Sequence, residues 1–118
     1  MPTLWPYPDS LDALAASAEH HQLLFEDDSI RVIDTKIGPR ERTAVHTHRY
    51  PSILYIVMAG TFLRHDDAGN LITDSRKMPP QVAPSAFRVA AMPPHSVENI
   101  GDTLIHLVNV EFKAEREA

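Results

Sequence analysis

Apolar and polar residues alternate over short stretches along most of this chain, a pattern typical of β-strands. The strongest stretch is SILYIVMAG at 52–60. Turn signals separate it from its neighbours, and many short strands with turns every 8 to 12 residues, roughly, favour a sandwich or barrel. The other stretches that we interpret as strands are SIRVIDTKI, TFLRH, LITDS, AFRVAAM, HSVENI and TLIHLVNVEF.

A helical pattern precedes the strands. Asp9 is suited to cap the helix, and Leu11, Leu14 and Ala18 are spaced to form one apolar stripe. The pattern predicts an N-terminal helix over 9–25, followed by a β-barrel over 29–113. A chain of 118 residues fits one domain, so we expect a single domain over 1–118.

The stretch SILYIVMAG is apolar on both of its faces. Ile53 and Tyr55 share one side, and Leu54 and Ile56 share the other. A strand solvated on one face would alternate, so both faces should be covered. We expect a second sheet over one face and either the N-terminal helix or a second copy of the chain over the other. A homodimer is the simpler explanation.

Composition limits the kinds of molecule that this chain is expected to bind. With 11 basic and 16 acidic residues the net charge is −5, which disfavours nucleic acid. No apolar run reaches the roughly 18 residues needed to span a bilayer, and no leader pattern opens the chain, so we expect a cytoplasmic protein without a membrane partner. The absence of cysteine leaves nitrogen and oxygen as metal ligands, which directs attention to the seven histidines.

Two histidines stand one residue apart just before the strongest strand. On an extended strand His46 and His48 point to the same side, which allows both imidazoles to reach one ion. Another strand, in PPHSVENIGD, starts near His95 after two prolines, with Asn99 on the same face. The residues therefore suggest a metal site whose third nitrogen comes from a distant segment.

The segment GPRERTAVHTHRYPSILYIVMAG, with PPHSVENIGD further along, resembles the two sequence motifs of the cupin superfamily. The first motif contains His-x-His, a glutamate and a closing glycine, and the second contains a histidine and an asparagine. The matching positions are His46, His48, Gly60, His95 and Asn99. The resemblance covers about residues 29–113 and implies an all-β cupin jelly-roll barrel, here with a short N-terminal α-helix.

The chain departs from these motifs at important positions. Ile53 stands where the family has its glutamate ligand, with Ser52 beside it. Gly38 lies too far from His46, and Met92 replaces the glycine before the second-motif histidine. The resemblance therefore implies the fold but leaves a three-histidine site, His46, His48 and His95, in place of the family's three histidines and one glutamate.

Such a site implies a divalent transition metal. Fe(II) is our first hypothesis, with Zn, Ni, Mn or Cu as alternatives, because three imidazoles accept most first-row ions. Three ligands leave positions open for a substrate or dioxygen. Some cupins with histidine-only sites are dioxygenases, so we expect a dioxygenase acting on a small polar metabolite, with Tyr55 as a proton carrier. A non-catalytic module that binds metal or a small ligand, and a metal-dependent isomerase or lyase, are the alternatives.

Several other polar residues are weaker candidates. Glu111 would replace the missing carboxylate only if its face of the last strand is interior. Arg49 and Arg64 have the chemistry to bind a carboxylate substrate in the barrel mouth. Asn99 is explained better by the Gly-Asp turn that follows it than by a role in the site. The remaining histidines, which we expect to be ordinary surface or core residues, are His20 and His21 on the helix, His65 and His106.

Overall fold

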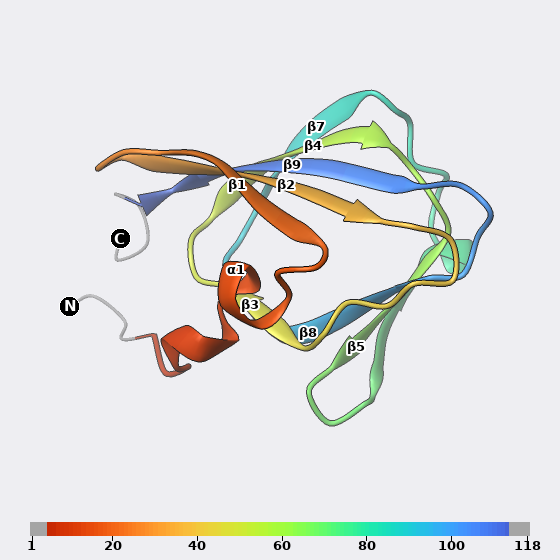
Figure 1. Cartoon of the computed structure of the whole chain (residues 1–118). Helices are drawn as coiled ribbons and strands as arrows, with labels where there is room; N and C mark the ends of the chain where they lie inside the picture. The colour runs from red at the N-terminus through yellow and green to blue at the C-terminus, as the bar shows by residue number, and fades with distance from the viewer. Residues whose placement is uncertain (1–4, 114–118) are drawn as a thin grey trace.

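The structure is a computed structural model that describes residues 5–113. Over this range two antiparallel sheets face each other and enclose a barrel (Figure 1). The predicted all-β architecture with a short N-terminal helix is confirmed. One sheet has the order β1 (His21–Glu26), β2 (Ile30–Ile37), β9 (Ile105–Phe112), β4 (Ser52–Met58) and β7 (Ser85–Val89), and the other has the order β3 (His46–His48), β8 (Met92–Asn99), β5 (Phe62–Asp66) and β6 (Leu71–Asp74).

The N-terminal helix is much shorter than predicted. A 3₁₀ turn, η1 (Asp9–Leu11), leads into the single helical turn α1 (Ala13–Ala16), whose first turn is capped by the Asp12 carboxylate. The prediction of a helix to residue 25 is wrong because HQLLFE forms β1 and pairs with β2 instead. Ladder hydrogen bonds along the open edge of β2 outweigh the helical preference of this short segment.

The apolar core lies on the inner faces of the sheets. In β4, Leu54 and Ile56 point inward and are buried, and Ile33 and Ile37 of β2 are buried on the same inner face of this sheet, two strands away. Tyr55 points the other way and is 42% exposed. Tyr55, the expected proton carrier, therefore points away from the barrel interior, because the inward-facing residues of β4 are those on the side of Leu54.

The outer face of the five-stranded sheet is also apolar. Tyr55 lies opposite Val108 and Ala86, and Ile53 lies opposite Val110, so these side chains share one surface. The helix does not cover this surface: α1 contacts β1 and β3 at one end of the barrel (Figure 1). Cover by a second copy of the chain stays a prediction.

The turn after β8 is held by Asn99, which is completely buried. Its Nδ2 donates to the carbonyls of Ile37 (2.9 Å) and Thr103 (2.8 Å), and its Oδ1 accepts from the Gly101 amide (2.9 Å). These bonds satisfy backbone groups that the turn would otherwise leave buried and unpaired. Asn99 thus serves the turn, and it fixes the end of the strand that carries His95.

None of the helices between residues 5 and 113 could span a lipid bilayer.

Candidate metal centre

Four histidines from three strands meet inside the barrel. β3 supplies His46 and His48, β8 supplies His95 directly opposite His46, and β1 supplies His21. All four side chains are buried. The ring of His46 lies at the middle of the group, with its centroid 4.6 Å from that of His21, 5.1 Å from that of His48 and 4.5 Å from that of His95.

The nitrogen atoms are close enough to share one ion. One ring nitrogen from each of His21, His46 and His48 lies within 4.8 Å of the others. The His95 ring adjoins this trio, with its centroid 5.7 Å from that of His48. The predicted ligands His46 and His48 are therefore brought together as expected, and His21 completes the tightest trio with His95 beside it. We call these four residues the histidine cluster.

Each ring of the histidine cluster is held by a hydrogen bond from Nδ1. The acceptors are the carbonyls of Ser17 for His21 (2.9 Å), Ala44 for His46 (2.8 Å) and Pro93 for His95 (2.8 Å), and the Glu111 carboxylate for His48 (2.9 Å). A carbonyl only accepts, so Nδ1 must carry the proton in each case, and likewise beside an ionised carboxylate. The neutral ring then has its lone pair on Nε2, the form that binds a metal.

Burial favours the neutral form of three members of the histidine cluster, His21, His46 and His95. Burial, followed by the neighbouring histidines, lowers the pKa of His46 to about 2. Burial is also the main cause that lowers the pKa values of His21 and His95, each to about 4. Imidazoles that stay deprotonated at Nε2 in weak acid do not need to lose a proton before they bind a cation.

Three charged side chains, Glu111, Arg31 and Asp12, form a connected series next to His48. Glu111 is completely buried; its Oε2 accepts from His48, and its Oε1 accepts from Nε of Arg31 at 2.7 Å. Arg31 also donates to both carboxylate oxygens of Asp12, at 2.6 and 3.2 Å. Glu111 faces the interior, which was the condition for it to replace the missing glutamate ligand of the first motif. Both of its oxygens are engaged, however, so it orients a ligand rather than acting as one.

The sequence interpretation placed His21 on a helix and did not include it in the site. That expectation is wrong because residue 21 begins β1, where it lies opposite Thr35 with its ring turned inward. One signal was present in the sequence. The first motif lacks its carboxylate ligand, and two adjacent histidines, His20 and His21, open the segment HHQLLFE, whose apolar residues are as compatible with a strand as with a helix.

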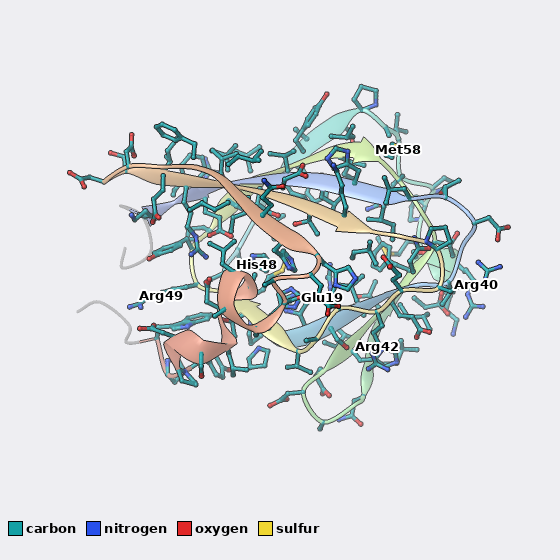
Figure 2. All side chains as sticks on the ribbon, in the orientation of Figure 1. Glu19, Arg40, Arg42, His48, Arg49 and Met58 are labelled. Atoms are coloured by element: carbon teal, nitrogen blue, oxygen red, sulfur yellow. The ribbon has the colours of Figure 1, made fainter. Side chains whose placement is uncertain are left out.

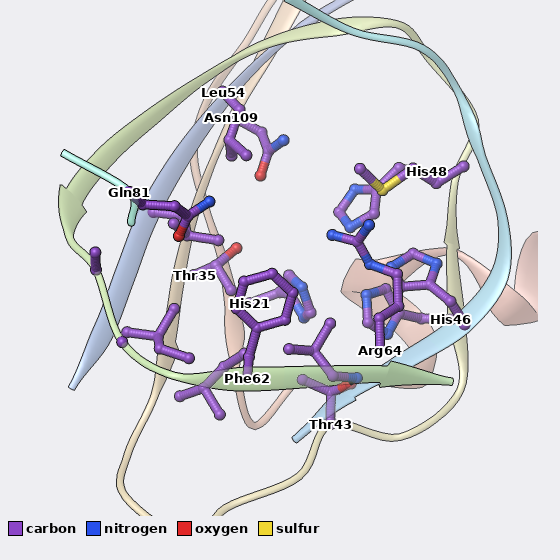
Figure 3. A pocket seen from close by; sticks show the side chains of 18 residues that line it. His21, Thr35, Thr43, His46, His48, Leu54, Phe62, Arg64, Gln81 and Asn109 are labelled. Atoms are coloured by element: carbon purple, nitrogen blue, oxygen red, sulfur yellow. Dashed lines mark hydrogen bonds between the residues drawn. The ribbon is translucent and has the colours of Figure 1, made fainter. Parts of the chain in front are cut away.

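The histidine cluster opens into a small cavity of about 70 Å³ (Figure 3). Its walls are mainly apolar, with a few polar side chains among them. The lining residues outside the histidine cluster that matter below are Thr35, Leu54, Phe62, Arg64, Gln81 and Asn109. Among the described residues that line it, none carries a carboxylate, an amine or a phenol.

The other candidates lie outside this cavity. Arg49 sits beside the N-terminal 3₁₀ turn, 3.7 Å from Asp9, and Figure 2 shows it pointing away from the barrel interior in which His48 lies. His106 pairs with Asp34 at 2.6 Å, and His20 lies 3.6 Å from Glu41. These histidines have structural or surface contacts, as expected.

Comparison with solved structures finds many relatives of low sequence identity. A cupin domain from Bordetella pertussis superposes with a TM-score of 0.60 and 18% identity, over 79% of this chain and 91% of that one. A conserved protein with a double-stranded β-helix domain from Klebsiella pneumoniae gives 0.55 and 16%, over 81% and 77%. The Cnp3 cupin domain of Schizosaccharomyces pombe gives 0.51 and 14%, over 80% and 64%. No protein-family model and no curated protein matches the chain.

Glu111→Gln tests the orienting role of this carboxylate. Glutamine has nearly the same shape, but it offers only one acceptor oxygen to His48 and Arg31 and leaves Arg31 without its buried counter-charge. We expect a 10- to 100-fold loss, roughly, of affinity for Co(II), measured by competition with a chelator. Glu26→Gln, at an exposed carboxylate on β1, should bind as the parent does, and equal affinity of both variants would contradict the role.

Stability of the metal-free protein should fall in weak acid. The unfolded chain takes up protons on these histidines near pH 6.5, whereas the folded His21 and His95 do so only near pH 4 and His46 near pH 2. Between these values the unfolded state binds more protons, so the stabilisation is complete above about pH 6.5 and declines below it, by up to about 1.4 kcal/mol per pH unit for each histidine.

Urea denaturation of chelator-treated protein at about pH 7 and about pH 5 measures this slope. His46→Gln removes the histidine whose pKa is lowered most, so the free energy of unfolding of this variant should depend less on pH. Equal free energies of unfolding at the two pH values would show that the buried imidazoles are not neutral.

Proposed function

We propose that this chain, which has the fold of the cupin superfamily, is a metal-dependent enzyme acting on a small polar metabolite, with an Fe(II) dioxygenase as the first candidate. The observation that carries the proposal is the histidine cluster. Several buried imidazoles, each tied at Nδ1, have no simpler use than to present Nε2 to one cation.

His21, His46 and His48 would hold the ion, with His95 as a further ligand. Four nitrogen donors leave two positions of an octahedral ion for other molecules. A bound first-row ion would supply Lewis-acid or one-electron chemistry at those positions. Nitrogen donors accept Zn, Ni, Mn and Cu as well as Fe(II), so this donor set supports a transition metal without naming it.

The cavity supports a small substrate. A volume of about 70 Å³ is well below the ~300 Å³ at which pockets for drug-sized ligands begin. The apolar walls, Leu54 and Phe62 among them, keep water from the reacting groups, while Gln81 and Asn109 offer hydrogen bonds to a polar molecule.

The lining favours oxygen chemistry over an isomerase or lyase. Those reactions move protons on carbon and commonly use a side chain as general base. Among the described lining residues, no carboxylate, lysine or tyrosine is present, and the imidazoles are committed at Nδ1. Tyr55, the sequence candidate for a proton carrier, is exposed on the outer face. Chemistry at the ion itself therefore suits this cavity better than side-chain acid–base chemistry.

Metal content provides the direct test. Protein purified without a histidine tag and loaded anaerobically with Fe(II) should contain about one equivalent by elemental analysis, and it should consume oxygen with a suitable substrate. His48→Ala should lose most of the metal because it removes a ligand. His106→Ala, which changes a histidine outside the cavity, should retain it.

Less than about 0.1 equivalent of every transition metal after loading would contradict the metal-enzyme proposal. Full metal content with no oxygen consumption across a panel of small acids and alcohols would instead favour the non-catalytic binding module.

We further propose that the chain is a homodimer whose interface includes the outer face of the five-stranded sheet. Tyr55, 42% exposed, lies in the middle of that face beside Val108 and Ala86. Tyr55→Glu would place a charge at the interface and should shift the mass measured by light scattering from dimer to monomer. Leu71→Glu, at a 53% exposed position on β6, should leave the mass unchanged. A monomeric parent would contradict the proposal.

A further inference from the structure

Arg64 is the only charged residue among the described residues that line the cavity. It lies on β5 opposite Val97 of β8, two residues along from His95. Its guanidinium carbon is 5.7 Å from the centre of the Phe62 ring, which helps to keep the side chain in the barrel. Figure 3 shows Arg64 reaching into the cavity from the side of His46.

This guanidinium has no polar partner in the described part of the chain. No hydrogen bond or salt bridge joins Arg64 to any of residues 5–113, and its Nε is buried without an acceptor. Arg31 presents the opposite case, since its guanidinium bonds to both Glu111 and Asp12. Burial lowers the pKa of Arg64, but a guanidinium keeps its proton in proteins. A half-buried cation without a partner among residues 5–113 therefore lines the cavity.

The charges around the cavity do not balance. The nearest buried carboxylate, Glu111, lies behind His48 and is already shared with Arg31. The imidazoles of the histidine cluster carry no negative charge, so they do not offset the Arg64 charge either. Arg64 is half-buried, and a charge that is partly withdrawn from water without a counter-ion is destabilising. A cation in the histidine cluster would add to the imbalance, and an anionic ligand would relieve it.

A second polar atom in the cavity lacks a partner. Oγ1 of Thr35, on β2, is buried without a hydrogen-bond partner among the described residues. Figure 3 shows Thr35 and Asn109 on one side of the cavity and Arg64 on the other. A ligand with an anionic end and a hydrogen-bonding group would therefore meet Arg64 at one end and Thr35 at the other.

We propose that the ligand is a small carboxylic acid whose carboxylate pairs with Arg64 and whose second polar group bonds to Thr35. A single guanidinium matches the two oxygens of a carboxylate with parallel hydrogen bonds. A phosphate ester carries more charge and more acceptor oxygens than this one cation can satisfy. The inference rests on the proposed function only for the reaction, because Arg64 and Thr35 line the cavity whether or not a metal is bound.

The test measures binding of glycolate, glycolamide and inorganic phosphate by calorimetry, on metal-free and on Co(II)-loaded protein. Glycolate should bind the parent, and Arg64→Gln should weaken it about 10- to 100-fold because a charge-assisted pair is lost. Arg64→Lys keeps the positive charge but loses the two parallel N–H donors of the guanidinium, so its affinity for glycolate should lie between those of the parent and Arg64→Gln. Arg40→Gln changes an exposed arginine distant from His48 (Figure 2) and should bind glycolate as the parent does. Thr35→Val should weaken glycolate less than Arg64→Gln does.

Glycolate binding that is unaffected by Arg64→Gln would overturn the proposal, as would equal binding of uncharged glycolamide by the parent. Tighter, Arg64-dependent binding of phosphate would also overturn it and would assign the subsite to phosphate oxyanions. The metal content of the same samples separates the two proposals. Arg64-dependent glycolate binding by protein that takes up no metal supports the acid subsite while the metal-enzyme proposal fails. One equivalent of Co(II) without glycolate binding overturns the acid subsite alone.

Discussion

The buried contact between Glu111 and His48 is the interaction on which the site depends. It joins the last strand, β9, to the short strand β3, and through Arg31 and Asp12 it extends to β2 and the start of the helix. A carboxylate this deeply buried is tolerable only because two donors satisfy it. Because Glu111 accepts a hydrogen bond from Nδ1 of His48, it also fixes the tautomer of that histidine. One carboxylate therefore both balances the charge of Arg31 and orients His48 toward a metal ion.

The other three imidazoles of the histidine cluster are held by backbone carbonyls and need no charged partner. Ala44 and Pro93 each lie two residues before the histidine that they bind, so the local chain path at the start of each strand sets the ring orientation. Ser17, at the end of α1, does the same for His21. The single helical turn therefore has a function beyond covering one end of the barrel, because it delivers the acceptor for a ligand on the following strand.

Strand spacing and motif order were sufficient to find most of the site. His46 and His48 share a face by the period of a strand, and His95 followed from the second motif. The sequence does not identify His21, because the three apolar residues of HQLLFE fit a helix as well as a strand until the open edge of β2 is known to need a partner. Tyr55 was misplaced for a related reason. When both faces of β4 are apolar, the sequence contains no signal for which one is interior, and the barrel selects Leu54.

The absent motif glutamate now has a physical consequence. In the cupin pattern that carboxylate brings a negative charge to the ion. Here a neutral imidazole, His21, comes from a different strand to the same cavity, while Arg64 adds a positive charge to it. Both changes act in the same direction, since they leave the site short of negative charge and make an anion its natural complement. If this balance governs the site, metal and acid should each bind more tightly in the presence of the other. The attraction between them is partly cancelled in solution by water, but a cavity of this size excludes most of that water.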